Sequence, residues 1–471
     1  MAKDIIKTLY NLPRYLLGKG YTEALRQIND VLPLEVINIP SGKEVGTWTV
    51  PQEWILKEAW IKFKGEKILE WKNDLSVMIY SQPTRGIVKL KELKEHLFHS
   101  IDNPETTPYQ FSFYEKNWGF CVPKEFVLKQ KPNLCENGDC HPELKAIDPE
   151  VGKVMIEGQD YSPKFVDVLE EGDYEVFIDS EFKPGVLQIG VHTIKGKTDR
   201  EILLFAHLDH PYQANDNLSG VQCLIDLAKK IEKDFQTHAN IDRHEHTIKV
   251  IFCPETIGSI AYAETQDISK VDFVISVDAC GNDNTLLIQK AFDKYARLNY
   301  AVHLAIHELG VSYRKGDFRA LIGSDEYYFN DPMVGIPGIM LSRYSYKEYH
   351  TSADTPEILK EDKIKETGDV ILKTIDIYEK DFIPVRKVKG VLCRSKFGLA
   401  TIHKYLNRDL DYLYYDMDGK KYLSEIVLPL GLTFEFAYNF IKKLEKNGIL
   451  GRFNNSQGKK QKTGRKKPKT V

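Results

Sequence analysis

An apolar run, Ile202–Ala206, gives way abruptly to polar residues near the middle of the chain. A run of this length and composition predicts a strand that is buried on both faces, as in a parallel sheet. Directly after it come His207, Asp209 and His210, and Asp216 follows in a short loop before the next apolar helix pattern. Because ligands bind outside the carboxyl ends of strands in open α/β sheets, we expect a binding site at this point.

Further strand patterns alternate with helical patterns between Gly172 and Phe382. The expected strands are Tyr174–Ile178, Val186–Val191, Ile202–Ala206, Thr247–Cys253, Phe273–Val277, Thr285–Gln289 and Ile336–Leu341. This alternation predicts an α/β domain with a mostly parallel central sheet flanked by helices. Apolar residues at helical spacing within residues 1–32 predict two more helices, and Leu34–Ile39 has the alternation of a half-buried strand.

Three other regions interrupt or follow this pattern. Between Gly46 and Val127, short strand-like pieces separated by turn residues predict a small β-rich domain inserted into the α/β domain. After Pro384, three short helical patterns predict a winged helix-turn-helix domain: Leu399–Leu406, Leu423–Leu430 and Thr433–Asn447. The expected organisation is an α/β domain over residues 1–45 and 128–383, the insertion over 46–127, the winged helix over 384–455 and a basic, disordered tail over 456–471.

Composition excludes several classes of protein. The 471 residues are 42% hydrophobic and 28% charged with a net charge of −3, which is typical of a soluble globular protein and gives no global field for nucleic acid. Seven scattered cysteines indicate reduced thiols in a cytoplasmic protein rather than a disulfide framework. No signal peptide or membrane-spanning run is expected. Cys135, Cys140 and His141 lack a fourth zinc ligand at suitable spacing, so we expect an exposed loop there.

Acidic or imidazole side chains also follow three other predicted strands: Glu255, Asp278 and His350. Histidine and aspartate together suit a zinc-like ion, and a carboxylate can bridge two cations because it has two oxygens. Either residue type alone at a strand end is commonly a hydrogen-bonding residue, a helix cap or an Asx-turn. Four strand ends that each carry such a group favour a metal site over these structural roles.

The sequence resembles the zinc aminopeptidase family with a co-catalytic metal pair, which includes leucyl-type exopeptidases and the glutaminyl-cyclase branch. The pattern of that family is His-x-Asp, Asp-Asn-x-Ser-Gly, Glu-Glu, Asp, and His-Thr with a downstream Asp-Thr. The matching segments here are His207–Asp209, Asp216–Gly220, Glu255–Thr256, Asp278, His350–Thr351 and Asp354–Thr355.

This resemblance implies a role for each matching residue. Asp216 would bridge two metals, and His207 and Asp278 would complete one of the two sites. His350 would belong to the other site, and Glu255 would be the general base. The resemblance to the zinc aminopeptidases covers about residues 1–40 and 165–380. A closer likeness is to a bacterial and archaeal subgroup with an inserted β domain and a C-terminal winged helix. Its signatures correspond to Ala214–Gly220, Pro254–Tyr262, Gly323–Glu326 and Glu348–Asp354.

Two positions depart from the family pattern. Thr256 stands where active members have the second Glu, a metal ligand, so the second metal is expected to bind weakly or not at all. Glu326 stands where the aminopeptidases often have a His that holds the reacting carbonyl, which leaves the substrate or its orientation open. His210 is a candidate extra ligand, although a wall of the site is the stronger expectation. Asp209 would orient His207 from outside the ligand shell.

These observations predict a metal-dependent hydrolase of amide bonds, an aminopeptidase-like exopeptidase that uses a metal-activated water and Glu255 as general base. The expected cofactor is Zn²⁺, with one tight site and a second that is weak or absent, and the expected substrate is a peptide or another small amide. Two alternatives stay open: an amidase or deacylase in surface glycan or peptide modification, and a metal-binding pseudo-enzyme that contacts protein or nucleic acid through its winged helix. No membrane partner is expected, and a homo-oligomer stays open.

Overall fold

The computed structural model describes residues 5–130, 155–156, 159–160, 165–237, 244–399 and 407–452. Within these residues the chain folds into two compact units, each made of segments that are distant in sequence. The first unit draws on Met1–Gly190, His207–Ser219 and Ser345–Leu359, and the second draws on Val191–Ala206, Gly220–Tyr344 and Lys360–Val471. The chain therefore enters the first unit three times, and two of those visits carry predicted site residues.

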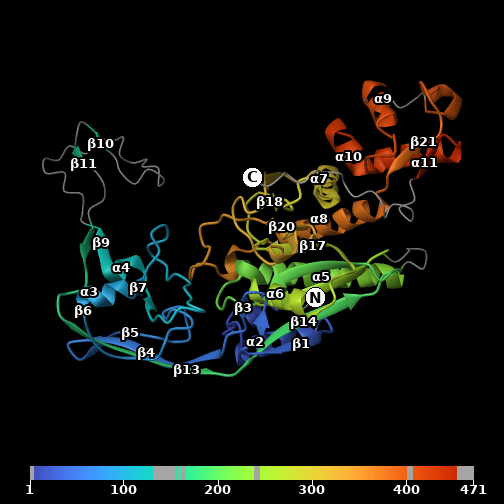
Figure 1. Ribbon diagram of the computed structural model, residues 1–471. Coiled ribbons are helices and arrows are strands. Elements are labelled where there is room, and N and C mark those ends of the chain that lie inside the picture. The colour runs from blue at the N-terminus through green and yellow to red at the C-terminus, as the bar shows by residue number, and fades with distance from the viewer. Residues whose placement is uncertain are drawn as a thin grey trace, which may run out of the picture. The chain divides into compact units, whose positions relative to one another are not determined.

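The first unit opens with two helices, α1 (Ile5–Leu9) and α2 (Lys19–Asn29), whose buried faces carry apolar residues at helical spacing. Its largest sheet has four antiparallel strands in the order β5-β4-β13-β6 (Figure 1). Their bounds are β4 (Glu53–Phe63), β5 (Glu66–Glu70), β6 (Thr84–Lys89) and β13 (Asp173–Lys183). The shorter elements are β1 (Glu35–Pro40), β2 (Glu44–Val45), β3 (Trp48–Thr49), α3 (Leu90–Glu95), β7 (Leu97–Phe98), β8 (Phe120–Cys121), α4 (Lys124–Val127), β9 (Leu128–Gln130), β10 (Met155–Ile156), β11 (Gln159–Asp160) and β12 (Phe165–Asp167).

Strand β13 corrects one of the sequence predictions. The pattern placed Tyr174–Ile178 among the strands of the α/β region, but β13 pairs antiparallel with β4 and β6 in the four-stranded sheet. The reason is visible in its burial, because Tyr174, Val176 and Ile178 are buried while the residues between them are less covered. Such alternation suits a sheet with one covered face, whereas strands of a two-sided α/β sheet are buried continuously.

The second unit is built on strands in the order β14-β16-β15-β17-β20-β18-β19 (Figure 1). Their bounds are β14 (Val186–Ile194), β15 (Glu201–His207), β16 (Thr247–Cys253), β17 (Val271–Asp278), β18 (Leu286–Gln289), β19 (Tyr313–Gly316) and β20 (Gly338–Ser342). The helices of the sheet region are α5 (Gly220–Thr237), α6 (Ile257–Thr265), α7 (Arg297–Leu309) and α8 (Glu361–Lys380), and α8 packs against both α5 and α7. The predicted α/β class is confirmed.

The sheet is mixed rather than uniformly parallel. β15 with β17, β17 with β20, and β18 with β19 are parallel pairs, whereas β18 and β20 are antiparallel. β18 begins only a short loop after β17 ends, at Asp278. A parallel connection needs a crossover of a dozen or more residues, so this short loop reverses the direction of β18.

The C-terminal part of the second unit contains α9 (Asn407–Tyr415), α10 (Leu423–Val427) and α11 (Phe434–Lys446), together with the antiparallel pair β21 (Pro384–Arg386) and β22 (Leu450–Arg452). α11 begins where the sequence places it, because the Thr433 hydroxyl accepts a hydrogen bond from the Phe436 N–H. The winged-helix class of this region stays a prediction.

Several sequence predictions concern residues outside the described ranges. They are the loop with Cys135, Cys140 and His141, most of the predicted helix Leu399–Leu406, and the basic tail over 456–471. Among the helices that are described, none is long and apolar enough to cross a membrane. Cys223, Cys253 and Cys280 are buried, in agreement with their apolar sequence context.

Candidate metal centre

The histidine loop, defined as residues 207–219, begins where β15 ends. The apolar residues of β15 are buried, and His207 is its last residue. A kinked turn at Asn215–Ser219, in which Asp216 and Asn217 have non-helical backbone angles, then leads into α5. The side chains of His207, Asp209, His210 and Asp216 are all buried. Polar groups of this kind are buried only where they have partners, so the loop is built as a polar centre inside the first unit.

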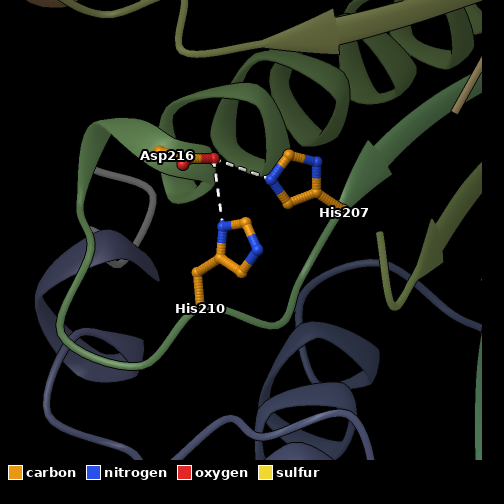
Figure 2. Close-up of side chains that lie close together, drawn as sticks. All are labelled: His207, His210 and Asp216. Atoms are coloured by element: carbon orange, nitrogen blue, oxygen red, sulfur yellow. Dashed lines mark hydrogen bonds and ion pairs between the residues drawn. The ribbon is translucent and has the colours of Figure 1, made fainter. Parts of the chain in front are cut away.

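Three imidazoles surround the carboxylate of Asp216. His207 Nε2 lies 2.8 Å and His210 Nδ1 lies 3.2 Å from Asp216 Oδ1, as Figure 2 shows. His350 Nε2 lies 2.9 Å from the other oxygen, Oδ2. Both carboxylate oxygens are therefore engaged by histidine, and His350 comes from a segment that is distant in sequence. The structure brings together the predicted ligands His207, Asp216 and His350 with His210, which the sequence offered as a candidate extra ligand.

The charge on this carboxylate is stabilised by its neighbours. Burial by itself would raise the pKa of Asp216, but the interactions with His210, His207 and His350 hold that pKa well below its usual range. Burial by itself would lower the pKa of His210, whereas Tyr109 and Asp216 raise it well above its usual value. Asp216 is therefore ionised, which is the form that binds a cation.

Two further side chains of the histidine loop lie beside the imidazoles. Asp209 Oδ2 is 3.9 Å from His210 Nε2. Asn217 Nδ2 is 3.4 Å from His207 Nδ1. A group at the second ring nitrogen of a metal-binding histidine fixes the orientation of its ring, and Asn217 was not singled out from the sequence. The orienting role of Asp209 toward His207 stays a prediction.

The His350 turn, defined as residues 345–359, runs beside residues 103–109, which we call the strap. Tyr109 N donates a hydrogen bond of 2.8 Å to His350 O, and Pro108 forms a bridge with Thr351. Ser352 N donates to Thr107 O at 2.8 Å, and Thr107 N donates to the Ser352 hydroxyl at 3.1 Å. The strap, which lies within the range predicted for the insertion, supports the turn that carries His350.

The ring of Tyr109 also packs against two histidines of the centre. Its side chain is 3% exposed, and its ring centroid lies 5.0 Å from that of His210 and 5.0 Å from that of His350. Sequence analysis missed this residue, because a single tyrosine in a β-rich stretch carries no motif. Its contact with two histidines depends on long-range folding.

Asp354 joins the histidine loop to the His350 turn. Its carboxylate accepts hydrogen bonds from the main-chain N–H of Asn215 at 2.6 Å, from that of Asp216 at 3.1 Å, and from the hydroxyl of Tyr346 at 2.7 Å. Burial raises the pKa of Asp354 to about 7 despite these donors. The sequence motif contained Asp354 without giving it a role, and the structure makes it the link between two segments of the centre.

Glu255 and Asp278 belong to the second unit. Glu255 lies two residues after the end of β16, and Asp278 is the last residue of β17. β16 and β17 are the two strands that flank β15 in the sheet. The carboxylate oxygens of Glu255 and Asp278 lie within 4.8 Å of each other. Glu255 and Asp278 are therefore neighbours in space.

Thr256 and the pair Asp325–Glu326 lie in the same unit. Thr256 has φ 61° and ψ −63°, which is rare for a β-branched residue. Its N–H donates to Asp325 Oδ1 at 3.0 Å. Glu326 is 1% exposed, and burial together with the neighbouring Asp325 raises its pKa to about 7. Sequence analysis named Asp325 only within a signature, and its hydrogen bond to Thr256 becomes visible only in the fold.

The donor set of the first unit suits zinc. Imidazole nitrogen and carboxylate oxygen are typical zinc ligands. Two ligands at about 2.0–2.1 Å from a tetrahedral ion lie about 3.3 Å apart. The histidine nitrogens lie 2.8–3.2 Å from the oxygens of Asp216, close to that separation. His207, His210, Asp216 and His350 are therefore the residues of this unit that could hold the ion.

Comparison with known proteins places the chain among related sequences. A family model described as "Domain of unknown function (DUF4910)" matches residues 3–381. A curated relative from Clostridium acetobutylicum is provisionally assigned as a polysaccharide biosynthesis protein with an aminopeptidase-like domain. It is 28% identical over 446 residues, which are 92% of this chain and 91% of that protein.

Solved structures show a similar fold. A crystal structure from C. acetobutylicum, provisionally assigned as a peptidase, is 26% identical with a TM-score of 0.71 and covers 96% of this chain and 95% of that chain. A zinc aminopeptidase from Bacillus subtilis is 14% identical with a TM-score of 0.53 and covers 79% of this chain and 94% of that chain. The second likeness concerns the fold alone, and it places the mixed α/β architecture beside that of the zinc aminopeptidases.

Proposed function

This chain belongs to the family described as Domain of unknown function (DUF4910), and we propose that it is a zinc-dependent, aminopeptidase-like hydrolase of amide bonds. The observation that carries this proposal is the buried carboxylate of Asp216, which is met on both oxygens by imidazoles from His207, His210 and His350. The C. acetobutylicum sequence that is assigned as aminopeptidase-like, and the C. acetobutylicum structure that is assigned as a peptidase, support the same class of reaction.

His207, Asp216 and His350 hold the ion in this proposal, His210 is a further ligand, and Asp278 completes the centre. Asp278, the last residue of β17, is included because the family pattern has an Asp ligand at this position. When bound, zinc supplies a Lewis acid that polarises the amide carbonyl and lowers the pKa of water. The buried, low-dielectric surroundings of Asp216 strengthen the attraction between its carboxylate and a cation.

Glu255 is the general base of the proposed reaction. Its carboxylate takes a proton from the attacking water and returns that proton to the nitrogen of the leaving amine as the C–N bond breaks. Glu255 is less buried than Asp278, which lies within reach of it. A carboxylate with access to solvent and substrate suits proton transfer, while a buried one suits the holding of an ion.

We further propose one tight metal and a second that is weak or absent. Thr256 offers a neutral hydroxyl where a two-metal family member has an anionic ligand. The N–H of Thr256 donates a hydrogen bond of 3.0 Å to Asp325 Oδ1, and Thr256 has a positive φ of 61°. If the second site proves tight, His210 and Glu326 are the first candidates to replace the missing ligand.

A second candidate function is an amidase or deacylase that acts in surface glycan or peptide modification. Two observations favour it: the polysaccharide biosynthesis assignment of the C. acetobutylicum relative, and Glu326 in place of the histidine expected from the aminopeptidase pattern. A carboxylic acid at position 326 would contact the substrate differently from the histidine of an aminopeptidase, so a different substrate would be favoured.

The test combines metal analysis with a substrate panel. Purified protein should contain zinc and should hydrolyse aminoacyl amides faster than N-acyl amides, and the reverse preference would support the second function. Glu255→Gln should keep zinc and fold but lose about 10²–10⁴-fold in rate, the usual contribution of a general base. Glu66→Gln, a change at an exposed position of β5, is the matched control. An active Glu255→Gln enzyme would exclude Glu255 as the base.

A further inference from the structure

Arg14 is buried beneath the histidine loop, and its guanidinium binds main-chain carbonyls of that loop. Nη1 donates to Leu208 O at 2.5 Å and to Asp209 O at 2.9 Å. Nη2 donates to His210 O at 2.7 Å and to Gln213 O at 3.0 Å. Nε donates to Leu9 O at 3.2 Å. Arg14 is 0% exposed, so one buried cation satisfies four carbonyls of the loop that carries the candidate ligands.

The loop needs such a partner because it has no sheet or helix ladder of its own between His207 and Asn215. Buried carbonyl groups without a hydrogen bond are costly, and they are normally satisfied by secondary structure. The loop also has two residues in the left-handed region, His210 with φ 68° and Tyr212 with φ 58°. Conformations of this kind persist only where the surroundings hold them. The guanidinium of Arg14 supplies part of that restraint.

We propose that Arg14 is a positioning residue of the metal centre, which fixes the main chain of residues 208–213 so that His207, His210 and Asp216 keep ligand spacing. This proposal rests on the proposed function, because it assumes that these residues bind a metal ion. Arg14 comes from the N-terminal segment and touches the loop through carbonyl oxygens, so it acts on the ligands through the main chain.

Arginine suits this role better than lysine. Its planar group presents five N–H donors in a fixed fork, and Arg14 directs them at five carbonyl oxygens from two segments. A lysine ammonium has three donors at one point and would leave at least one carbonyl of the loop without a partner. Burial lowers the pKa of Arg14 to about 10, while Asp209 and Asp216 oppose that shift, so the side chain stays charged at pH 7.

The experiment compares zinc binding by the full chain with Arg14→Met, Arg14→Lys and Ile28→Ala. Each protein is stripped of metal with a chelator, and zinc is titrated back by calorimetry. Arg14→Met should weaken zinc binding by about 10–100-fold, the usual effect of losing a partner that orients metal ligands. Arg14→Lys should recover part of that loss. Ile28 is buried in α2, so Ile28→Ala should lower thermal stability and leave zinc affinity unchanged.

A spectroscopic readout separates positioning from stability. The visible spectrum of the Co²⁺-substituted protein reports the geometry of the ligands, so Arg14→Lys should change its band positions while Ile28→Ala should not. If Arg14→Met does not fold, the Arg14→Lys protein carries the test. Unchanged zinc affinity and an unchanged cobalt spectrum in the Arg14 variants would overturn this proposal alone. A wild-type protein that binds no zinc would instead overturn the proposed function.

Discussion

The histidine loop and the His350 turn both bring imidazole to the carboxylate of Asp216, but their main chains are held by different means. Four carbonyls of the histidine loop accept hydrogen bonds from Arg14, a single buried side chain. The His350 turn pairs with the strap through main-chain hydrogen bonds, including the one from Tyr109 N to His350 O. The histidine loop thus depends mainly on the side chains of Arg14 and Asp354, and the His350 turn depends on the backbone of the strap.

This difference changes what substitution can do. A side-chain change at Arg14 removes four hydrogen bonds of the histidine loop at once, whereas most side-chain changes in the strap leave its main-chain pairing intact. The strap has no catalytic motif in its sequence, and its role in the structure is to support the His350 turn. The strap supports the turn that carries His350, so deletion of the strap should affect His350 before it affects His207.

Asp216 is common to both segments, so its substitution should have the largest effect. Asp216→Asn leaves the three imidazoles around a neutral amide. We expect zinc affinity to fall by more than about 100-fold, because loss of a partner outside the ligand shell already costs about 10–100-fold. Competition with a chromophoric chelator measures the change, and Asp199→Asn, at an exposed position, is the control. Wild-type affinity in Asp216→Asn would remove this residue from the centre.

Substitution of Asp354, which links the histidine loop to the His350 turn, should have the second-largest effect. Asp354→Asn replaces an oxygen with an NH₂ group, so at least one of the two main-chain donors, Asn215 N or Asp216 N, faces another donor. An unsatisfied buried group costs about 1–3 kcal/mol of unfolding free energy, measured by urea denaturation. In the double variant Asp354→Asn/Arg14→Met, the loss of zinc-binding free energy should differ from the sum of the two single losses, because both changes act on the histidine loop. Strict additivity would mean that Asp354 and Arg14 act on separate parts of the centre.

The strap prediction compares two variants at one position. Tyr109→Pro removes the N–H donated to His350 O, whereas Tyr109→Phe keeps that hydrogen bond and the ring. We expect the proline variant to lose about 1–3 kcal/mol of unfolding free energy and to bind zinc more weakly than the phenylalanine variant. A larger loss of zinc affinity in Tyr109→Phe would show that the hydroxyl, and not the main chain, supports the centre.

The smallest effect is expected at Ser352. Ser352→Ala deletes the hydroxyl that accepts from Thr107 N but keeps the main-chain bond from Ser352 N to Thr107 O. Because Ser352 is exposed, the loss of unfolding free energy should be within about 0.5 kcal/mol and zinc affinity should stay at the wild-type value. A substantial loss of zinc affinity would contradict the view that backbone pairing dominates in the strap.

Local patterns in the sequence predicted the strands that carry the candidate residues. The apolar run before His207 indicated β15, and the strand patterns before Glu255 and Asp278 indicated β16 and β17. These strands could be predicted because a strand that is buried along its whole length has a continuous run of apolar residues. The candidate residues at their ends could be named for the same reason.

The pairing of strands and side chains that are distant in sequence could not be predicted in this way. The strand pattern of β13 is clear, but nothing in it says whether its partners are β4 and β6 or the central sheet. Arg14 follows a proline in a segment with no motif, and Tyr109 lies in a turn-rich stretch. Their roles come from carbonyl groups and rings supplied by distant segments, and a single sequence does not specify such partners.

We infer that His207, His210, His350 and Asp216 hold a metal ion, and X-ray absorption at the zinc edge of the purified, zinc-loaded protein tests this assignment. We expect a first shell of nitrogen and oxygen at about 2.0–2.1 Å, with the multiple-scattering signal of at least two imidazoles and no sulfur. Loss of part of the imidazole signal in His350→Ala would agree with that assignment. A shell of sulfur at about 2.3 Å, or a spectrum without imidazole scattering, would contradict it.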